Sequence, residues 1–244
     1  IKLTGASCTP HKENFSVEIG TKNSSNEFKR LRIHLTGDLY IDSVCADNKV
    51  VSYDIDERFP NYTDIIFSES VSHVKLWLSS IGQLTIYGAS LLNDCNGVIY
   101  NVIGNNGASY YSYNNMGDLG RDCQVLSPDL FIISLGANEA FGNLSNEAFY
   151  TTISNLTNDL LSHNPNASIL LATPMECQKN GRINNKIKQF RDVIIQFGID
   201  NNIAVYDWYE IAGGYNASNN WVNDRLMGKD RIHNTSNGYY IQGT

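Results

Sequence analysis

Asp230 and His233 are the residues whose types and spacing most directly suggest chemistry. A carboxylate three residues before a histidine, in a loop, can direct both side chains into one cleft. The carboxylate can then hold the imidazole in one tautomer while the ring takes a proton from a serine hydroxyl. The alternatives for such a pair are an exposed loop contact and a helix cap. The hydrolase interpretation therefore requires oxyanion donors, a scaffold and a nucleophile elsewhere in the chain.

Two further candidate residues follow predicted strands. The apolar run 130–135 leads directly into Gly136-Ala137-Asn138-Glu139, where the Asn138 amide can donate a hydrogen bond to a developing oxyanion. The apolar run 98–103 leads into a glycine-containing loop, in which the backbone N–H of Gly107 is a possible second donor. The alternatives are that Asn138 caps the following helix and that Gly107 belongs to an ordinary turn.

The second half of the chain alternates between apolar strand patterns and helical patterns. We predict strands at residues 98–103, 130–135, 168–172 and 203–206, and helices at residues 147–162 and 183–197. Parallel neighbouring strands require crossovers, so this alternation predicts a parallel sheet with helices on both faces. In such sheets the site lies at the carboxyl ends of the strands, which is where the oxyanion candidates fall.

The first half has the period of two that is typical of strands. Leu31, Ile33 and Leu35 alternate with polar residues, and the pattern recurs over residues 74–79. Short strands separated by turn residues predict an antiparallel β-sandwich or jelly roll. We therefore expect a β-rich module at residues 1–87 and an α/β domain at residues 88–244. The last strand of the module, residues 84–87, should end in a tight break at Gly88-Ala89-Ser90.

Composition excludes several classes of function. The chain has 244 residues and a formal net charge of -7, which disfavours a nucleic-acid partner because phosphate binding needs a basic surface. No apolar run approaches the roughly 20 residues of a membrane span. The five cysteines include no CxxC pair, so we expect no zinc site. The oligomeric state and the disulfide state of the cysteines do not follow from the sequence.

The segments "GVIYNVIGNNGASYYSY", "LSPDLFIISLGANEAF" and "DRIH" resemble the later blocks of the SGNH (GDSL-type) hydrolases, over roughly residues 97–243. They are most similar to a branch in which a β-rich module is inserted after the serine-bearing first block and whose members look like carbohydrate or peptidoglycan esterases. The resemblance implies a three-layer α/β/α, flavodoxin-like parallel sheet and no metal or organic cofactor. It also implies that Gly107 and Asn138 are oxyanion donors, Asp230 the acid and His233 the base. Glu139 stands where the family commonly has Asp and keeps its charge.

The serine block of that family is the part that the sequence lacks. Gly37-Asp38-Leu39 has no serine, and Gly88-Ala89-Ser90 has no aspartate. Ser90 also lies too close to Gly107 for a parallel crossover, which needs about a dozen residues. We therefore interpret Ser90 as a turn serine and keep it only as a weak candidate. The nucleophile is expected upstream of Ile1, which would leave the α/β domain incomplete, with an open position in its sheet; we also expect this domain to be incomplete at its C-terminal end.

The resemblance implies a serine esterase that removes an acetyl or other short acyl group from a carbohydrate or peptidoglycan, and we expect a secreted or periplasmic protein. The alternative is a catalytically inactive protein of the same fold that binds glycan, with a carbohydrate-binding β-rich module. Trp208 and Trp221 lie near the catalytic loop in sequence and are candidates for stacking on a sugar ring; the alternative is that both are core residues.

Overall fold

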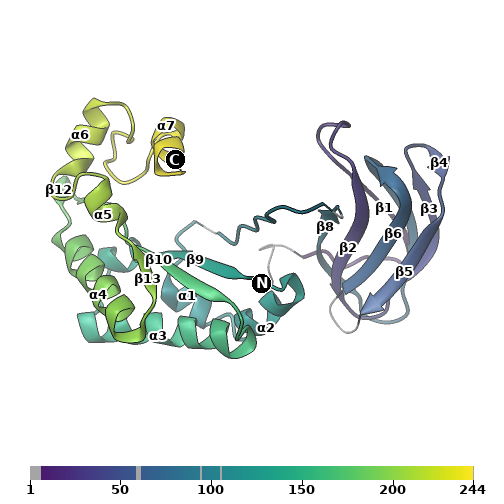
Figure 1. Cartoon of the computed structure of the whole chain (residues 1–244), viewed down its shortest axis with the longest axis horizontal. Coiled ribbons are helices and arrows are strands. Elements are labelled where there is room, and N and C mark those ends of the chain that lie inside the picture. The colour runs from purple at the N-terminus through teal and green to yellow at the C-terminus, as the bar shows by residue number, and fades with distance from the viewer. Residues whose placement is uncertain (1–6, 59–61, 94, 105, 244) are drawn as a thin grey trace. The chain divides into compact units, whose positions relative to one another are not determined.

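The computed structural model describes residues 7–58, 62–93, 95–104 and 106–243 (Figure 1). The chain divides into two compact units, Ile1–Gly104 and Asn105–Thr244. The boundary that we expected after residue 87 falls inside a strand, β8 (Thr85–Leu92), which belongs to the first unit.

The first unit contains two antiparallel sheets in the described residues. One sheet has the order β1 (Asn14–Gly20), β7 (His73–Ser79), β3 (Tyr40–Ala46) and β4 (Lys49–Val50). The other has the order β5 (Tyr53–Arg58), β6 (Tyr62–Val71), β2 (Phe28–Thr36) and β8. Leu31 of β2 and Leu76 of β7, both 0% exposed, belong to one buried cluster, so the two sheets share a core. The predicted antiparallel strands are thus present, and no helix forms in the described part of this unit.

The predicted break at Gly88-Ala89-Ser90 is wrong. β8 continues to Leu92 and pairs with β2 along its length, with a shift of register between His34 and Leu35. Gly88, which pairs with His34, has a φ of +143°, a conformation that glycine adopts without steric cost. The glycine therefore marks a bulge within a strand rather than the end of one.

The second unit is built on three parallel strands in the order β13 (Ala204–Tyr206), β10 (Ser168–Ala172) and β9 (Leu130–Ser134). Two long helices, α3 (Asn146–His163) and α4 (Asn185–Asn201), are the crossovers between them. These strands and helices were predicted from the sequence and are confirmed, with shifts at their ends. The remaining elements are α1 (Tyr110–Asn114), α2 (Leu119–Cys123), η1 (Gln124–Leu126), η2 (Glu139–Phe141), the hairpin β11 (Gln178–Lys179) and β12 (Arg182–Ile183), α5 (Trp208–Ile211), α6 (Ala217–Asn223) and α7 (Ser236–Gly243). In the described residues, no helix combines the length and apolar composition needed to cross a bilayer.

Helices α3 and α4 are held to each other and to the sheet by their apolar faces. The side chain of Ser145 accepts a hydrogen bond from the N–H of Ala148 and so caps α3. Phe149 of α3 stacks on Phe190 of α4 with ring centroids 4.0 Å apart, and both side chains are 0% exposed. This packing joins the two crossover helices into one layer.

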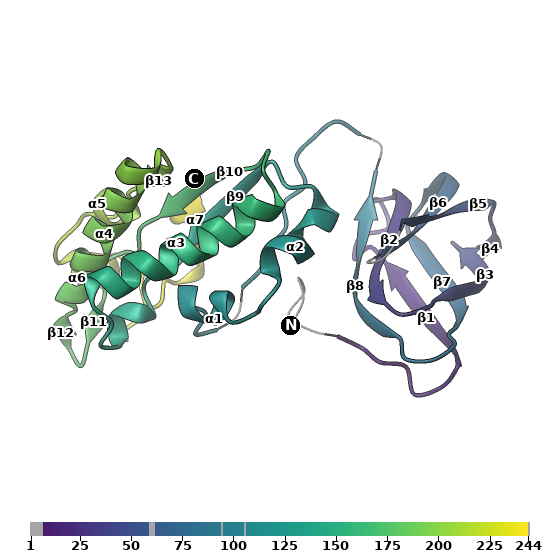
Figure 2. The same ribbon diagram turned by 90° about the horizontal axis from the view of Figure 1, so that it is seen from below.

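One face of the parallel sheet carries the helical layer, and the other face is open in the described residues. Ile133 and Leu171 are 7% and 0% exposed, whereas Leu130 and Ile132 on the opposite face are 49% and 57% exposed. Figure 2 shows α3 and α4 on the same side of the strands. Both crossovers step in the same direction across the sheet, and right-handed crossovers in one direction place their helices on one face. The expected third layer is therefore not formed by the described residues, because the strand order never reverses.

The predicted strand at residues 98–103 is not formed. Val98, Ile99 and Tyr100 are 94%, 70% and 78% exposed and lie in irregular structure. A strand is stabilised by backbone hydrogen bonds to a neighbouring strand. In the described residues this apolar run has no such neighbour, so it does not form a strand. The apolar pattern thus predicted a strand, and the segment is irregular instead.

Candidate active site

Asn138 and the loop of Gly107 meet beyond the carboxyl end of β9. The side-chain amide of Asn138 donates a hydrogen bond of 2.7 Å to the carbonyl oxygen of Ala108. An asparagine amide has two N–H groups, so one can hold the loop while the other remains to donate elsewhere. Gly107 has a φ of +77°, which explains why a glycine is needed here. The structure thus brings together the two residues that the sequence suggested as oxyanion donors.

Glu139 ties the same loop to the end of β9. Its Oε1 accepts a hydrogen bond of 2.5 Å from the backbone N–H of Tyr110, the first residue of α1. The side chain of Ser109 caps that helix by accepting from the N–H of Ser112. Glu139 is 8% exposed, and its burial raises the pKa of the carboxyl group. From the sequence, Glu139 was only a variant of a family pattern, and its contact with α1 was not foreseen.

Asp230 and His233 form a hydrogen-bonded pair in the loop before α7. Asp230 Oδ2 lies 2.7 Å from His233 Nδ1, while Oδ1 accepts hydrogen bonds of 3.1 and 3.2 Å from the N–H groups of Ile232 and His233. The hydrogen bond from His233 lowers the pKa of Asp230 below its usual value. With Nδ1 directed at the carboxylate, Nε2 is the nitrogen that can accept a proton. The imidazole is accessible, because 73% of the His233 side chain is exposed.

A network of polar side chains from other elements holds this loop. Arg231 has a φ of +56°, and its carbonyl oxygen accepts a hydrogen bond of 3.0 Å from the N–H of Gln178 in β11. Arg231 Nε donates to Asn219 Oδ1 at 2.9 Å, and Gln178 Nε2 donates to the same oxygen at 3.1 Å. Gln178 is 6% exposed and also contacts the buried Ser218 at 3.3 Å. These partners are distant in sequence, so sequence patterns gave no signal for them.

The family model of GDSL-like lipases and acylhydrolases matches residues 84–241 of the sequence. The chain belongs to the GDSL-like lipase/acylhydrolase family. No curated protein matches it.

The chain is also similar to the solved structures of several esterases. A peptidoglycan O-acetylesterase is similar with a TM-score of 0.64 and 16% identity, over 96% of this chain and 74% of the other. An acetyl xylan esterase, AlAXEase, is matched with a TM-score of 0.45 and 23% identity, over 56% of this chain and 73% of the other. An acetylxylan esterase of Geobacillus stearothermophilus is matched with a TM-score of 0.41 and 20% identity, over 56% and 64%. The first of these shares the fold of the GDSL-like chain over most of its length.

Ser90 of the GDSL-like chain has a histidine partner, but it is not His233. Its hydroxyl lies 2.9 Å from Nε2 of His34, across the β2–β8 pairing of the first unit. Burial, and next the positive charge of Arg32, lower the pKa of His34. The Nδ1 of His34 is buried and has no hydrogen-bond partner in the described residues, so no carboxylate orients this ring. The pair has the character of a packing contact between strands.

Trp208 and Trp221 of the GDSL-like chain are core residues. They are 3% and 8% exposed, and their rings pack edge to face with centroids 5.6 Å apart. The indole N–H of Trp221 donates to the carbonyl oxygen of Ala212 at 2.9 Å. Together with Ala217 and Met227 they form a small core around α5 and α6. Of the two alternatives for these tryptophans, the structure supports the core and not a platform for sugar.

Proposed function

We propose that this protein is a serine esterase that removes an acetyl or other short acyl group from a carbohydrate or peptidoglycan. The observation that carries the proposal is the 2.7 Å contact between Asp230 Oδ2 and His233 Nδ1, which leaves Nε2 as a base in a member of an acylhydrolase family. The similarity to a peptidoglycan O-acetylesterase supports an acylated glycan as substrate. Such substrates lie outside the cytoplasm, so we propose a secreted or periplasmic location.

The proposed mechanism assigns each residue one role. A serine attacks the ester carbonyl, His233 takes the serine proton and later gives it to the leaving alcohol, and Asp230 stabilises the imidazolium. The N–H of Gly107, the amide of Asn138 and the N–H of the serine donate to the tetrahedral oxyanion. Each such donor is worth roughly 2.7–4 kcal/mol in the transition state. No metal or organic cofactor takes part in these steps.

We propose that the nucleophile lies on a strand that pairs with the edge of β9 to which no strand of the described residues is paired. In the order β13-β10-β9 the crossovers all step in one direction, and a reversal requires the serine strand next to β9 and a second strand on its far side, from which the chain crosses back to β9. The apolar run at residues 98–103 is our candidate for that second strand. A reversal brings helices to the face on which Leu130 and Ile132 are exposed. Sites in open α/β sheets lie at this point of reversal, and Asn138 follows β9 directly. We propose that the serine block, expected upstream of Ile1, supplies the strand next to β9.

The alternative is a glycan-binding protein without catalysis. It is favoured by one observation: in the described residues, no serine hydroxyl makes a hydrogen bond with His233, whose partner is Asp230. In that case the oxyanion residues and the acid–base pair would bind acyl groups without turning them over.

Hydrolysis of an aryl acetate by the protein including its upstream segment separates the two. We expect hydrolysis in the parent and a fall in kcat of at least about 10⁴-fold in His233→Ala. His73→Ala, which removes a half-exposed histidine of the first unit, is the matched control and should retain full activity. Full activity in His233→Ala would refute the esterase assignment. A parent protein that binds acetylated glycan but releases no acetate would establish the alternative.

A further inference from the structure

The outer face of the sheet β1-β7-β3-β4 carries an exposed tryptophan at its centre. Trp77 lies on β7, which is paired on both sides by β1 and β3. Its neighbours Leu76 and Leu78 point into the core and are 0% and 1% exposed, whereas Trp77 points outward and is 40% exposed. Trp208 and Trp221, the other tryptophans of the chain, are buried. An indole ring left in water in the middle of a sheet suggests a ligand that covers it.

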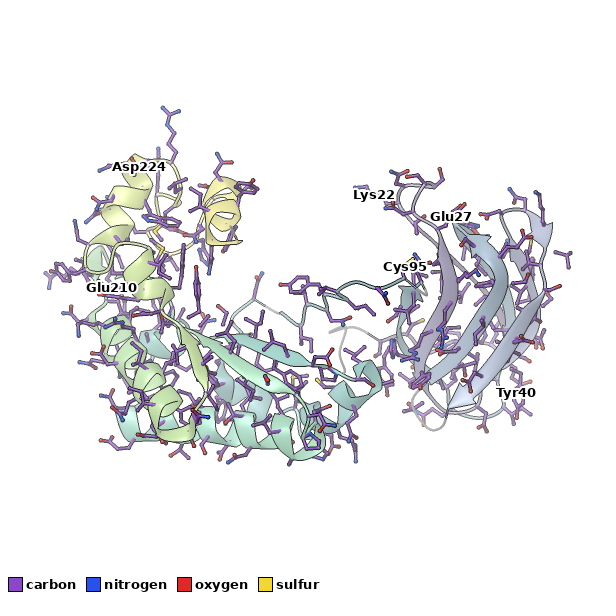
Figure 3. All side chains as sticks on the ribbon, viewed as in Figure 1. Lys22, Glu27, Tyr40, Cys95, Glu210 and Asp224 are labelled. Carbon is purple, nitrogen blue, oxygen red and sulfur yellow. The ribbon has the colours of Figure 1, made fainter. Side chains whose placement is uncertain are left out.

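A second aromatic ring lies on the same face. Tyr40 of β3, labelled in Figure 3, is 48% exposed and pairs with Ser79, two residues beyond Trp77 on β7. Residues two apart on a strand share a face, so Tyr40 and Trp77 are diagonal neighbours at about 7–8 Å between backbones. Two rings at this separation can stack on neighbouring rings of one oligosaccharide.

Small polar side chains surround the two rings. Ser16 of β1 and Ser43 of β3 are exposed and stand opposite Trp77 on either side. Ser79 donates a hydrogen bond of 2.9 Å to Asp42 Oδ1, at the bulge of β3. Hydroxyl and carboxylate groups at these positions can exchange hydrogen bonds with sugar hydroxyls. The face therefore presents apolar rings beside hydrogen-bond donors and acceptors, which matches the apolar C–H faces and the hydroxyl groups of a sugar.

The charges beside Trp77 neutralise each other. Lys75 Nζ lies 2.7 Å from Glu18 Oε1 and 5.5 Å from the centroid of the Trp77 ring. The hydrogen bond and charge of Lys75 lower the pKa of Glu18, which favours the ionised carboxylate. A polyanion would need uncompensated cations on this face, which the paired Lys75 does not provide. The chemistry fits an uncharged ligand.

We propose that the outer face of this sheet, centred on Trp77 and Tyr40, binds an uncharged glycan chain. The apolar C–H faces of two sugar rings stack on the two aromatic rings, and sugar hydroxyls bond to Ser16, Ser43 and the Ser79–Asp42 pair. This binding does not rest on the proposed esterase activity, because none of these residues belongs to the second unit. If both hold, the first unit keeps the glycan attached while the second unit removes its acyl groups.

Affinity electrophoresis of the whole chain in native gels tests the proposal, with soluble xylan, hydroxyethyl cellulose and glycol chitin as probes. We expect at least one probe to retard the chain, and Trp77→Ala to lower the affinity by about tenfold or more. Tyr40→Ala should weaken binding less, and Trp77→Phe should restore part of it. Tyr215→Ala removes a 69% exposed tyrosine of the second unit and should bind as the parent does. Because Trp77 and Tyr40 are exposed, all variants should keep the parental unfolding temperature.

Tryptophan fluorescence gives a second reading from the same proteins. Trp77 is the exposed one of the three tryptophans, so the retarding glycan should shift the emission of the parent to the blue and leave the emission of Trp77→Phe unchanged. If no probe retards the parent, or if Trp77→Ala binds as tightly as the parent, the proposal is wrong. In the protein that includes its upstream segment, aryl acetate hydrolysis should be the same with and without Trp77→Ala, so a failure here is distinct from a failure of the esterase assignment.

Discussion

The two units of the chain each contain a histidine whose ring nitrogen contacts a side-chain oxygen. The two pairs differ in the exposure of the histidine and in the chemical type of its partner. His34 is 8% exposed and meets the hydroxyl of Ser90 at 2.9 Å. His233 has a side chain that is 73% exposed and meets the carboxylate of Asp230 at 2.7 Å. A serine within reach of a histidine is therefore not enough to suggest a nucleophile. A base also needs a carboxylate on its other nitrogen and access to substrate.

The largest expected effect in the second unit, after loss of the imidazole itself, comes from Asp230→Asn. An amide at this position can donate its N–H₂ group to Nδ1 and so favour the tautomer of His233 whose proton is on Nε2. A protonated Nε2 cannot accept the proton of the serine. By analogy with the serine proteases we expect kcat for an aryl acetate to fall by about 10⁴-fold in the protein that includes its upstream segment. Asp224→Asn, an exposed aspartate at the end of α6, is the control and should leave kcat unchanged. Unaltered kcat in Asp230→Asn would remove the distinction between the two histidines.

A smaller effect is expected from Asn138→Ala. Loss of one oxyanion donor lowers kcat by about 10²–10³-fold and leaves KM nearly unchanged, because the donor acts on charge that develops only in the transition state. The exposed Asn143, which follows the same strand end, gives the matched control Asn143→Ala. A rise in KM with kcat unchanged would mean that Asn138 binds the ground state, and the oxyanion role would then be wrong.

The same comparison explains which parts of the site could be predicted from sequence. Asp230 and His233 are three residues apart, so their contact follows from local chain geometry alone. Ser90 and His34 are 56 residues apart, and their contact depends on the pairing of β2 with β8. The link between Asn138 and Ala108 spans 30 residues and was predicted only as proximity at the strand ends. Contacts that depend on the pairing of segments distant in sequence leave no pattern in the neighbouring residues from which they could be predicted.

The fold was predictable where the local sequence pattern of a single helix or strand is enough to identify it. Phe149 and Ile153 recur at the helical period and are both 0% exposed in α3, as an amphipathic helix requires. The apolar run at residues 98–103 has the composition of a strand, but a strand also needs a partner, which composition does not reveal. Gly88 was interpreted as a strand end because a glycine in a sequence is equally compatible with a turn and with a bulge, and the structure shows the bulge.

The part-buried pair of His34 and Ser90 in the first unit should matter for stability and not for catalysis. Ser90→Ala removes the partner of His34 Nε2 and leaves that nitrogen unsatisfied, which costs about 1–2 kcal/mol. Urea unfolding of the first unit measures the loss, with Ser24→Ala at an exposed position as the control. In the protein that includes its upstream segment, hydrolysis of an aryl acetate should be the same with and without Ser90→Ala, and a fluorophosphonate should not label Ser90. Labelling of Ser90 in the parent would make it a nucleophile after all.

The smallest expected effect is a pH dependence of stability that His34 causes. Burial lowers the pKa of His34 below its ordinary value of 6.5, so as the pH falls the unfolded chain takes up a proton before the folded chain does. The stabilisation is therefore complete above the unfolded pKa and is lost as the pH falls towards the lowered folded pKa.

Between pH 8 and pH 6 this loss is less than about 1 kcal/mol, because the unfolded histidine is protonated only in part over that range. His34→Gln keeps a polar side chain that can reach Ser90 and has no proton to gain. The free energy of unfolding of His34→Gln should thus change less over this interval than that of the parent. His73→Gln replaces a half-exposed histidine and should follow the parent. Parallel curves for the parent and His34→Gln would show that His34 titrates alike in the folded and unfolded chain, and the contrast with His233 would then rest on the carboxylate alone.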